Sequence, residues 1–341
     1  MLGREFESLQ RGVGIAEISG FNRYEVSGPA ALEWLDSLSC SQLWRAVGEL
    51  SLAYFLTDTG NVSSEATIAN LGNNRFWYGS VAAAEHHDWG WLSARVPEYG
   101  VRLERLTHRH TTLLIAGPRS RELLAKVAPR TQWERHAFPW ITVQQVFVGH
   151  CTALAMCVSY SGELAFELHV PNEQLYACYE TLRLAVEHFD VSSFGLYAVE
   201  SMRLDKGHRH WKADLISDFD LFESDLGRFV RLDKDTFPGK SALLEWLEKD
   251  APRRKFASLV LHTDEAPAHP GESLLVGDEV VGSVPSSGWG HRTRKKFALT
   301  FVGPQHAEIG ARLDVLMLGR RFAVQVCHAC LYDSTNDHIR A

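Results

Sequence analysis

Two segments of the chain repeat one local pattern: a short β-like run, a glycine-proline pair and an amphipathic helix. The run over residues 21–26 leads to Gly28-Pro29 and the helical stretch AALEWLDSLS. The run over residues 112–115 leads to Gly117-Pro118 and RSRELLAKVA. Proline is tolerated in the first turn of a helix because its missing N–H has no acceptor there, and leucines then recur at helical spacing. The repetition predicts two related α+β layers rather than one long sheet.

The last part of the chain follows a different pattern. A third helix is predicted from Pro171, after the strongest strand signal at residues 153–170, and helices alternate with strands as far as residue 248. After a charged stretch at residues 248–255, short apolar runs are separated by Gly, Asp or Pro turns, as in a small antiparallel barrel. These runs cover residues 256–261, 273–276, 279–284, 297–302, 313–318 and 321–326. We therefore predict an α+β region over residues 1–248 and a C-terminal β-barrel domain over residues 249–341.

Composition excludes several classes of protein. With 45% apolar and 23% charged residues, the chain has the composition of a globular protein, not of a disordered or collagen-like one. Its net charge of −7 argues against binding to nucleic acid, which is a polyanion. The N-terminal segment carries charges where a signal peptide needs apolar residues, and no apolar run approaches the roughly 20 residues that span a bilayer. We expect a cytoplasmic protein that binds neither membrane nor nucleic acid.

Motifs for common cofactors are incomplete. Gly12-Val13-Gly14 lacks the third glycine of the dinucleotide fingerprint, and no GxxxxGK[ST] pattern occurs, so no flavin or nicotinamide domain is expected. The stretch Cys327-His328-Ala329-Cys330 has zinc-like spacing but no second pair, and we predict no metal there. The six cysteines are spread thinly, which favours reduced thiols over disulfides.

One predicted strand places a carboxylate opposite an apolar face. Strand alternation over residues 158–170 sends Leu164, Phe166, Leu168 and Val170 to one side and Ala165, Glu167 and His169 to the other. A carboxylate can accept two hydrogen bonds side by side from a heterocycle that carries N–H groups. A solvated outer face would produce the same pattern, so both interpretations stay open at this point.

A second segment, residues 201–215, combines a helix end with basic and aromatic residues. The helix is expected to end at Gly207. If Arg203 on this helix is buried, it needs an acidic partner or an anionic ligand. Trp211 in the extended part is more typical of a core or interface residue than of a ligand platform, and the His208-Arg209-His210 run favours local hydrogen bonding over metal binding.

The order and spacing of these segments resemble the folate-dependent aminomethyltransferase family, which includes glycine cleavage T-protein and the tetrahydrofolate-binding half of dimethylglycine and sarcosine dehydrogenases. RHW-x-x-D and the LYD near the end are most similar to the dimethylglycine dehydrogenase branch. The resemblance implies a three-domain cloverleaf, with two ferredoxin-like α+β lobes and a C-terminal antiparallel β-barrel around a central folate channel. It is carried by GVGIAEISGFNRYEVSGPAALEWLD, LIAGPRSRELL, VSYSGELAFELHVP, SMRLDKGHRHWKADL, FESDLGRFVRLDKDTFPGKSALL and AVQVCHACLYDSTNDHIR.

The resemblance also implies roles for particular residues. Glu65, in the stretch GNVSSEATI, stands where the family has its reacting aspartate, and Val81 stands where the classical T-protein has an asparagine near the folate. One extra methylene moves a carboxylate by about 1.5 Å, which changes what it can reach. Catalytic roles are implied for Glu65 and Tyr160, and tetrahydrofolate is expected to contact Tyr160, Glu167, Arg203 and Trp211.

The implied activity is tetrahydrofolate-dependent transfer of a methyl or methylene group, which would make the protein a demethylase for a small methylated amine or betaine-like donor. A separate flavoprotein oxidase would supply an oxidised donor for the methylene route. One alternative is direct methyl transfer from a sulfonium or aryl methyl ether, with Trp77, Tyr78, Trp211 and Trp289 as candidate aromatic contacts. Another is a non-catalytic folate-binding protein that assists iron–sulfur assembly, although its Lys-Gly-Cys-Tyr signature is replaced here by Lys206-Gly207-His208-Arg209.

Overall fold

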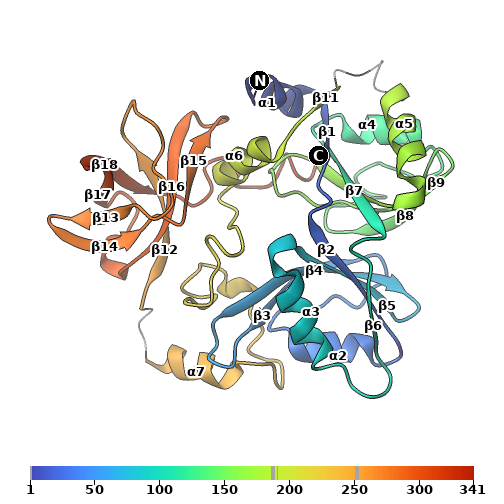
Figure 1. Cartoon of the computed structure of the whole chain (residues 1–341), viewed down its shortest axis with the longest axis horizontal. Coiled ribbons are helices and arrows are strands. Elements are labelled where there is room, and N and C mark those ends of the chain that lie inside the picture. Colours follow the sequence, from blue (N-terminus) through green and yellow to red (C-terminus); the bar gives the residue numbers. More distant parts are fainter. Residues whose placement is uncertain (1, 186–188, 190, 250–252) are drawn as a thin grey trace.

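The computed structural model describes residues 2–185, 189, 191–249 and 253–341. Figure 1 shows three bodies around a common centre: two α+β lobes on one side and a curled, mostly antiparallel sheet on the other. The helix α6 (Leu196–Lys206) lies between the C-terminal sheet and the second lobe. This arrangement agrees with the predicted α+β fold.

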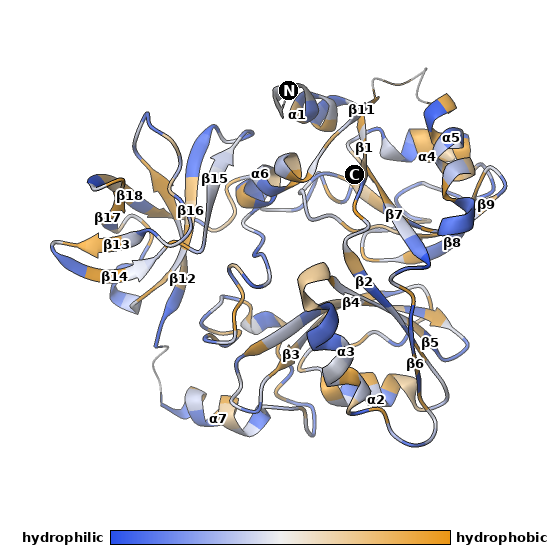
Figure 2. Ribbon diagram, in the orientation of Figure 1, coloured by the Kyte–Doolittle hydropathy of each residue, from blue (hydrophilic) through white to orange (hydrophobic). Residues whose placement is uncertain are grey.

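The first lobe is a five-stranded sheet with two helices on one face. The strand order is β3-β4-β5-β2-β6. Helices α2 (Ala31–Leu38) and α3 (Glu85–Ser93) pack against the sheet in one apolar core. Figure 2 shows α2 with alternating apolar and polar stretches, as expected for a helix that buries a single face. The strands are β2 (Phe21–Ser27), β3 (Leu50–Leu56), β4 (Val62–Gly72), β5 (Arg75–Val81) and β6 (Arg102–Arg105).

The second lobe also consists of one sheet with two helices on one face, and its sheet has one strand more. The strand order is β11-β1-β7-β10-β9-β8, and helices α4 (Ser120–Val127) and α5 (Leu175–Ala185) cover one face. Strand β1, which precedes the first lobe in the chain, pairs with β7 and therefore belongs to this second sheet. The strands are β1 (Val13–Glu17), β7 (His110–Ala116), β8 (Val143–Val148), β9 (Cys151–Met156), β10 (Ala165–Pro171) and β11 (Val191–Ser193), and α1 (Leu2–Arg11) packs beside β1.

The predicted repeat is confirmed at both glycine-proline pairs. Gly28 and Gly117 each have φ of +122°, which favours glycine. A Cβ atom on Gly28 would lie 2.3 Å from the carbonyl oxygen of Gly100, and one on Gly117 would lie 2.6 Å from that of Gly12. The helices begin at Ala31 and Ser120, beyond the prolines, because the prolines lie in turns closed by hydrogen bonds to the carbonyls of Gly28 and Gly117.

The strand signal at residues 153–170 corresponds to two strands, not one. Strand β9 ends at Met156 and β10 begins at Ala165. Between them Gly162 adopts φ of +86° and its N–H donates to the Ser159 hydroxyl, so the chain turns there. The helix predicted from Pro171 begins as a 3-10 turn at Asn172–Gln174 and continues as α5; the predicted part beyond residue 185 falls largely outside the described residues.

The C-terminal sheet has seven strands in the order β14-β13-β17-β18-β12-β16-β15. Six of them were predicted, and β15 (Ser286–Gly290) was missed because its sequence, SSGWG, has little strand propensity. The predicted boundary after residue 248 lies at the end of α7 (Lys240–Glu248), and residues 250–252 of the charged stretch are outside the described residues. The other strands are β12 (Lys255–Leu261), β13 (Ser273–Val276), β14 (Glu279–Ser283), β16 (Lys295–Val302), β17 (Arg312–Met317) and β18 (Arg320–Cys327).

The helix-free faces of the two lobes meet at the centre of the molecule. An apolar cluster joins them and contains Leu50, Ala69 and Trp77 of the first sheet, Val143 and Met156 of the second, and Leu106 just after β6. The lobes therefore share one core where their strands face each other. Among the described helices, none has the length and apolar character to cross a membrane.

Candidate functional site

A cavity of about 110 Å³ lies between the two lobes, next to the shared core. Strands β2, β3, β4 and β5 of the first lobe and β9 and β10 of the second contribute to its wall. Two of the predicted site residues, Glu65 and Glu167, line it together, although they are far apart in the chain. The wall also contains Asn22, Arg23, Thr67, Trp77, Gly79, Val81, Met156 and His169, among others.

Glu65 reaches the cavity from the middle of β4. Its cross-strand neighbour on β3 is Tyr54, whose buried hydroxyl shares a hydrogen bond with the carboxylate. Burial raises the pKa of Glu65 above its ordinary value, while the Tyr54 hydrogen bond and the charge of Arg209 oppose the shift. Glu65 is thus a carboxyl group that takes up a proton more readily than an exposed one.

Glu167 and His169 reach the cavity from β10, and the predicted alternation of this strand is confirmed. Phe166, Leu168 and Val170 are buried in the core under α4 and α5. Glu167 and His169 face the opposite way, into the cavity. Glu167 therefore does not lie on a solvated outer face.

Polar residues behind Glu167 were not assigned a role from the sequence. Nε2 of His169 lies 3.2 Å from a carboxylate oxygen of Glu167, and Nδ1 lies 2.8 Å from the Thr112 hydroxyl. Arg23, which is fully buried, donates to the same hydroxyl at 2.5 Å. The signal that could have identified Arg23 was a charge at the position between Asn22 and Tyr24, both of which are buried in the same strand, since a buried charge needs partners.

Tyr160 lies outside the cavity wall. The residue is 39% exposed, its ring stacks on His208, and its hydroxyl donates to the carbonyl of Arg209 at 3.1 Å. His208 in turn contacts the carbonyl of Tyr160 through Nδ1 at 3.0 Å, and burial lowers the pKa of His208 to about 4. Tyr160 and the segment after α6 thus hold each other in place.

Arg203 also lies outside the cavity wall, and its charge is matched within the protein. The guanidinium is 1% exposed, donates to Asp214 at 2.7 Å and to the Ser286 hydroxyl at 3.0 Å, and pairs with Glu200. The sequence left open whether an acidic partner or an anionic ligand matches the charge of Arg203, and acidic partners do so. Trp211 is 5% exposed and packs in the same apolar cluster as Tyr54.

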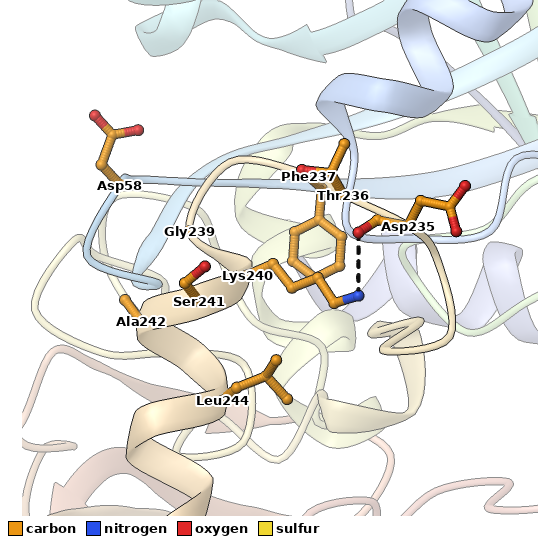
Figure 3. A pocket seen from close by; sticks show the side chains of 9 residues that line it. All are labelled: Asp58, Asp235, Thr236, Phe237, Gly239, Lys240, Ser241, Ala242 and Leu244. Atoms are coloured by element: carbon orange, nitrogen blue, oxygen red, sulfur yellow. Dashed lines mark hydrogen bonds between the residues drawn. The ribbon is translucent and has the colours of Figure 1, made fainter.

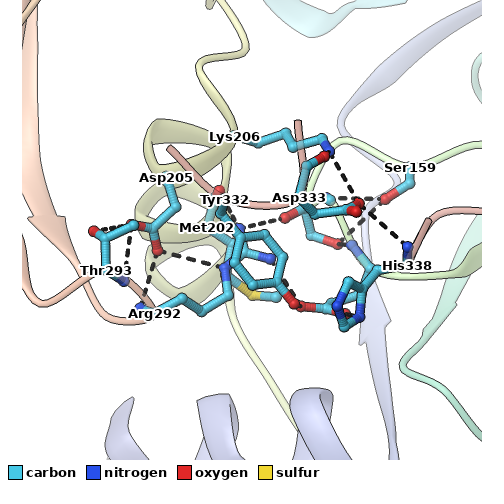
Figure 4. A network of polar contacts seen from close by, with 12 residues as sticks. Ser159, Met202, Asp205, Lys206, Arg292, Thr293, Tyr332, Asp333 and His338 are labelled. Carbon is cyan, nitrogen blue, oxygen red and sulfur yellow. Dashed lines mark hydrogen bonds and ion pairs between the residues drawn. The ribbon is translucent and has the colours of Figure 1, made fainter. Parts of the chain in front are cut away.

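A buried ionic network fixes the surroundings of α6 (Figure 4). Arg292, from the turn between β15 and β16, donates to Glu163 at 2.8 Å and lies 3.4 Å from Asp205 at the end of α6. Lys206 pairs with Asp333 of the C-terminal segment at 3.1 Å. The network joins the loop before β10, the end of α6 and the C-terminal sheet, so it positions Arg203 relative to the second lobe.

A larger cavity, of about 440 Å³, lies at the surface near the start of α7 (Figure 3). It is lined by Asp58, Asp235 and Lys240, among others, and contains none of the predicted site residues. The ammonium of Lys240 already donates to backbone carbonyls, including that of Asp235 at 3.3 Å. The described residues contain no group of three or more His, Cys, Asp or Glu side chains arranged to hold a metal ion.

Two family models match the chain. The GCVT N-terminal domain matches residues 1–234, and the glycine cleavage T-protein C-terminal barrel domain matches residues 254–333. The chain belongs to the glycine cleavage T-protein family. The predicted family and fold class are therefore confirmed.

Individual relatives agree with this assignment. Rat mitochondrial dimethylglycine dehydrogenase is 26% identical over 95% of this chain, but the match covers only 38% of that protein. The aminomethyltransferase of Symbiobacterium thermophilum is 26% identical over 97% of this chain and 89% of its own length. The crystal structure of glycine cleavage system aminomethyltransferase T from Bartonella henselae has a TM-score of 0.87 over 98% of this chain and 90% of that chain, at 22% identity, which shows the shared fold. Membership in the T-protein family supports folate-dependent one-carbon transfer.

Proposed function

We propose that this T-protein family member binds tetrahydrofolate in the cavity between the lobes and transfers a methyl or methylene group to it from a small methylated amine or betaine-like donor. The single observation that carries the proposal is that Glu65 and Glu167 line one cavity from two different lobes. The lining of the cavity also supports the proposal, because its carboxylates can accept N–H groups of a flat heterocycle while Trp77, Val81 and Met156 offer apolar contact.

The two carboxylates have different tasks in this proposal. Glu167 accepts hydrogen bonds from the N–H edge of the pterin and so fixes its orientation. Tetrahydrofolate supplies a nucleophilic ring nitrogen, and each new nitrogen–carbon bond requires that nitrogen to lose its proton. Glu65 accepts this proton, for which its raised pKa is suited, and in the methylene route can return it to the departing amine, or to the departing hydroxyl group when the donor is formaldehyde. In direct methyl transfer from a betaine-like donor, the quaternary nitrogen leaves as a neutral amine, and the proton passes on to solvent.

We propose supporting roles for the remaining predicted residues. Tyr160, which is partly exposed, contacts the part of tetrahydrofolate that extends beyond the cavity. Arg203 keeps that end of the binding region ordered through Asp214 and Glu200. Trp211 acts through Tyr54, with which it shares an apolar cluster, and so supports Glu65. The residues over 1–248 would hold the folate, and those over 249–341 would brace α6.

For an amine donor, we propose that a separate flavoprotein oxidase produces the iminium or formaldehyde that this chain consumes. The support is that several relatives are dehydrogenases and that the chain spans 37–38% of their length, so that part of their activity belongs to other regions. The alternative of direct methyl transfer from a sulfonium or aryl methyl ether donor has less support, because Trp77 alone among the four candidate aromatic residues lines the cavity.

The test is to incubate the purified protein in aerated buffer with thiol-protected tetrahydrofolate and a panel of methylated amines, with and without an amine oxidase that uses the dissolved oxygen, and to identify the folate product by mass. Betaines, sulfonium compounds and aryl methyl ethers complete the panel. A methylene product that depends on the oxidase, or a methyl product without it, supports the proposal and selects the route. Tight folate binding with no turnover of any donor would contradict it and favour a folate-binding protein.

A further inference from the structure

A chain of polar contacts runs from Arg23 in the first lobe to Glu167 in the second. The Arg23 guanidinium donates to the carbonyls of Ser19 and Phe21 at 3.1 and 2.9 Å, which leaves its other terminal nitrogen directed at Thr112. The Thr112 hydroxyl contacts Nδ1 of His169 at 2.8 Å. All three side chains are at least 95% buried, so water does not compete for these contacts.

The chemistry of these groups fixes the position of the hydrogens. Arginine has only donors, so the Thr112 oxygen accepts from Arg23. The described residues offer the Thr112 hydroxyl one further partner, Nδ1 of His169, and the hydroxyl proton is satisfied only if Nδ1 accepts it. Burial lowers the pKa of His169, which favours a neutral ring. A neutral imidazole that accepts at Nδ1 carries its proton at Nε2.

The Nε2 atom then presents an N–H group at the wall of the cavity. It lies 3.2 Å from Glu167 and has no other polar partner among the described residues. The ring of Trp77 packs against the imidazole at 5.0 Å between centroids and restricts its rotation. The cavity therefore holds a donor and an acceptor side by side on β10, both supplied by residues that face the same way.

We propose that His169 is a specificity-determining residue that, together with Glu167, recognises a lactam edge, which is a ring N–H beside a ring carbonyl. This inference rests on the proposed function, since it assumes that a pterin occupies the cavity. Glu167 accepts the ring N–H, and Nε2–H of His169 donates to the neighbouring carbonyl oxygen. An analogue that carries an amino group in place of this carbonyl offers His169 a donor where it needs an acceptor, and a buried donor without an acceptor is costly.

The first experiment tests the hydrogen positions without any folate. Nitrogen NMR of the isotopically labelled protein, with the His169 signals assigned by their loss in His169→Gln, is expected to show a neutral ring protonated at Nε2. Thr112→Val removes the donor to Nδ1 and should shift the Nδ1 resonance or mix the two tautomers, whereas Thr112→Ser should keep the wild-type pattern. A ring protonated at Nδ1, or a charged ring at neutral pH, would overturn the inference.

The second experiment measures recognition as a ratio of two affinities. Dissociation constants are compared for tetrahydrofolate and tetrahydroaminopterin, in which an amino group replaces the ring carbonyl and the neighbouring ring nitrogen loses its hydrogen. Glu167 is present in every protein compared, so a change of the ratio between wild type and variant reports on His169 alone. His169→Leu should shift the ratio by about tenfold toward the amino analogue, which corresponds to the loss of one hydrogen bond. His169→Gln, whose amide N–H lies near the Nε2 position, should keep most of the wild-type ratio. Thermal melting of each variant confirms that it is folded.

The outcomes separate this inference from the proposed function. If the wild type binds tetrahydrofolate and His169→Leu leaves the ratio unchanged, His169 does not read the carbonyl and the inference fails while the proposed function stands. If the wild type binds neither ligand, the proposed function fails and this inference fails with it. The NMR result holds in either case, because it concerns the protein alone.

Discussion

The two α+β lobes share a scaffold but not the groups that face the cavity. Both use the same strand order, β3-β4-β5-β2 in the first and β8-β9-β10-β7 in the second, and both begin their first helix after a glycine-proline turn. Strand register makes Glu167 of β10 the counterpart of Trp77 of β5. Glu167 pairs with Leu114 and Trp77 pairs with Glu25, and these two partners lie the same number of residues before Gly117 and Gly28. A carboxylate in one lobe thus corresponds to an indole in the other.

The comparison extends to the second carboxylate and to the contact between the lobes. Register places Thr152 of β9 where the first lobe has Glu65. Arg23 and Thr112 stand at equivalent positions of β2 and β7, and they touch each other at 2.5 Å. The duplicated scaffold brings the two sheets face to face. The residues at equivalent positions of the two facing sheets differ, and they give Glu65 and Glu167 different surroundings. Similar folds therefore do not imply similar chemistry within one molecule.

The different roles of Glu65 and Glu167 are tested most directly by replacing each carboxylate with its neutral amide. Glu65→Gln should lower single-turnover transfer by about a hundredfold, because the amide cannot accept the proton. The dissociation constant for tetrahydrofolate should change by less than about threefold. The measurement uses whichever donor the panel identifies, and Glu65→Asp, which restores the family residue, serves as the matched variant. A fully active Glu65→Gln enzyme would remove Glu65 from the chemistry.

Glu167→Gln should instead weaken tetrahydrofolate binding and leave the transfer rate nearly unchanged. An amide of the same shape keeps one acceptor and loses the charge, so tetrahydrofolate should bind about 10- to 30-fold more weakly, as expected for hydrogen bonds to a charged group. Once the protein is saturated, transfer should stay within about threefold of the wild type. Glu7→Gln, at an exposed carboxylate on α1, provides the control. Equal loss in both acid variants, in binding and in turnover, would mean that the two carboxylates share one role.

The sequence predicted the parts of the molecule that depend on local pattern. The glycine-proline turns, the alternation at Phe166 and Glu167, and most strands of the C-terminal sheet follow from spacing and turn residues alone. The insertion of β1 into the second lobe could not be predicted this way, because strand pairing between distant segments leaves no periodic signal. The placement of Glu65 and Glu167 in one cavity could not be predicted for the same reason. The resemblance indicated each residue, but only the packing of the two sheets brings them together.

The shared scaffold can be tested at its two glycines. Gly28→Ala and Gly117→Ala should each destabilise the protein by about 1–3 kcal/mol, because the new methyl group meets a backbone carbonyl and φ of +122° is strained for alanine. Chemical denaturation measures the free energy of unfolding. Gly90→Ala is the control, since it lies in α3 with open space around it and should be neutral or stabilising by up to about 1 kcal/mol. Tolerance at one glycine and not at the other would show that the lobes are less equivalent than their strand order suggests.

The smallest effect should appear in the pH dependence of stability. Burial raises the pKa of Glu65 in the folded protein, so the folded state binds more protons than the unfolded state between the two pKa values. The stability of the wild type relative to Glu65→Gln should therefore fall as pH rises through this range, and the variant should melt at the higher temperature at neutral pH.

Glu180, whose pKa is lowered by its hydrogen bond to Arg183, provides the control with the opposite sign. The wild type should lose its stability advantage over Glu180→Gln as pH falls. Melting curves at several pH values measure both differences. Parallel pH curves for the wild type and Glu65→Gln would mean that desolvation of Glu65 is offset in solution, and the case for Glu65 as the proton acceptor would then rest on its position alone.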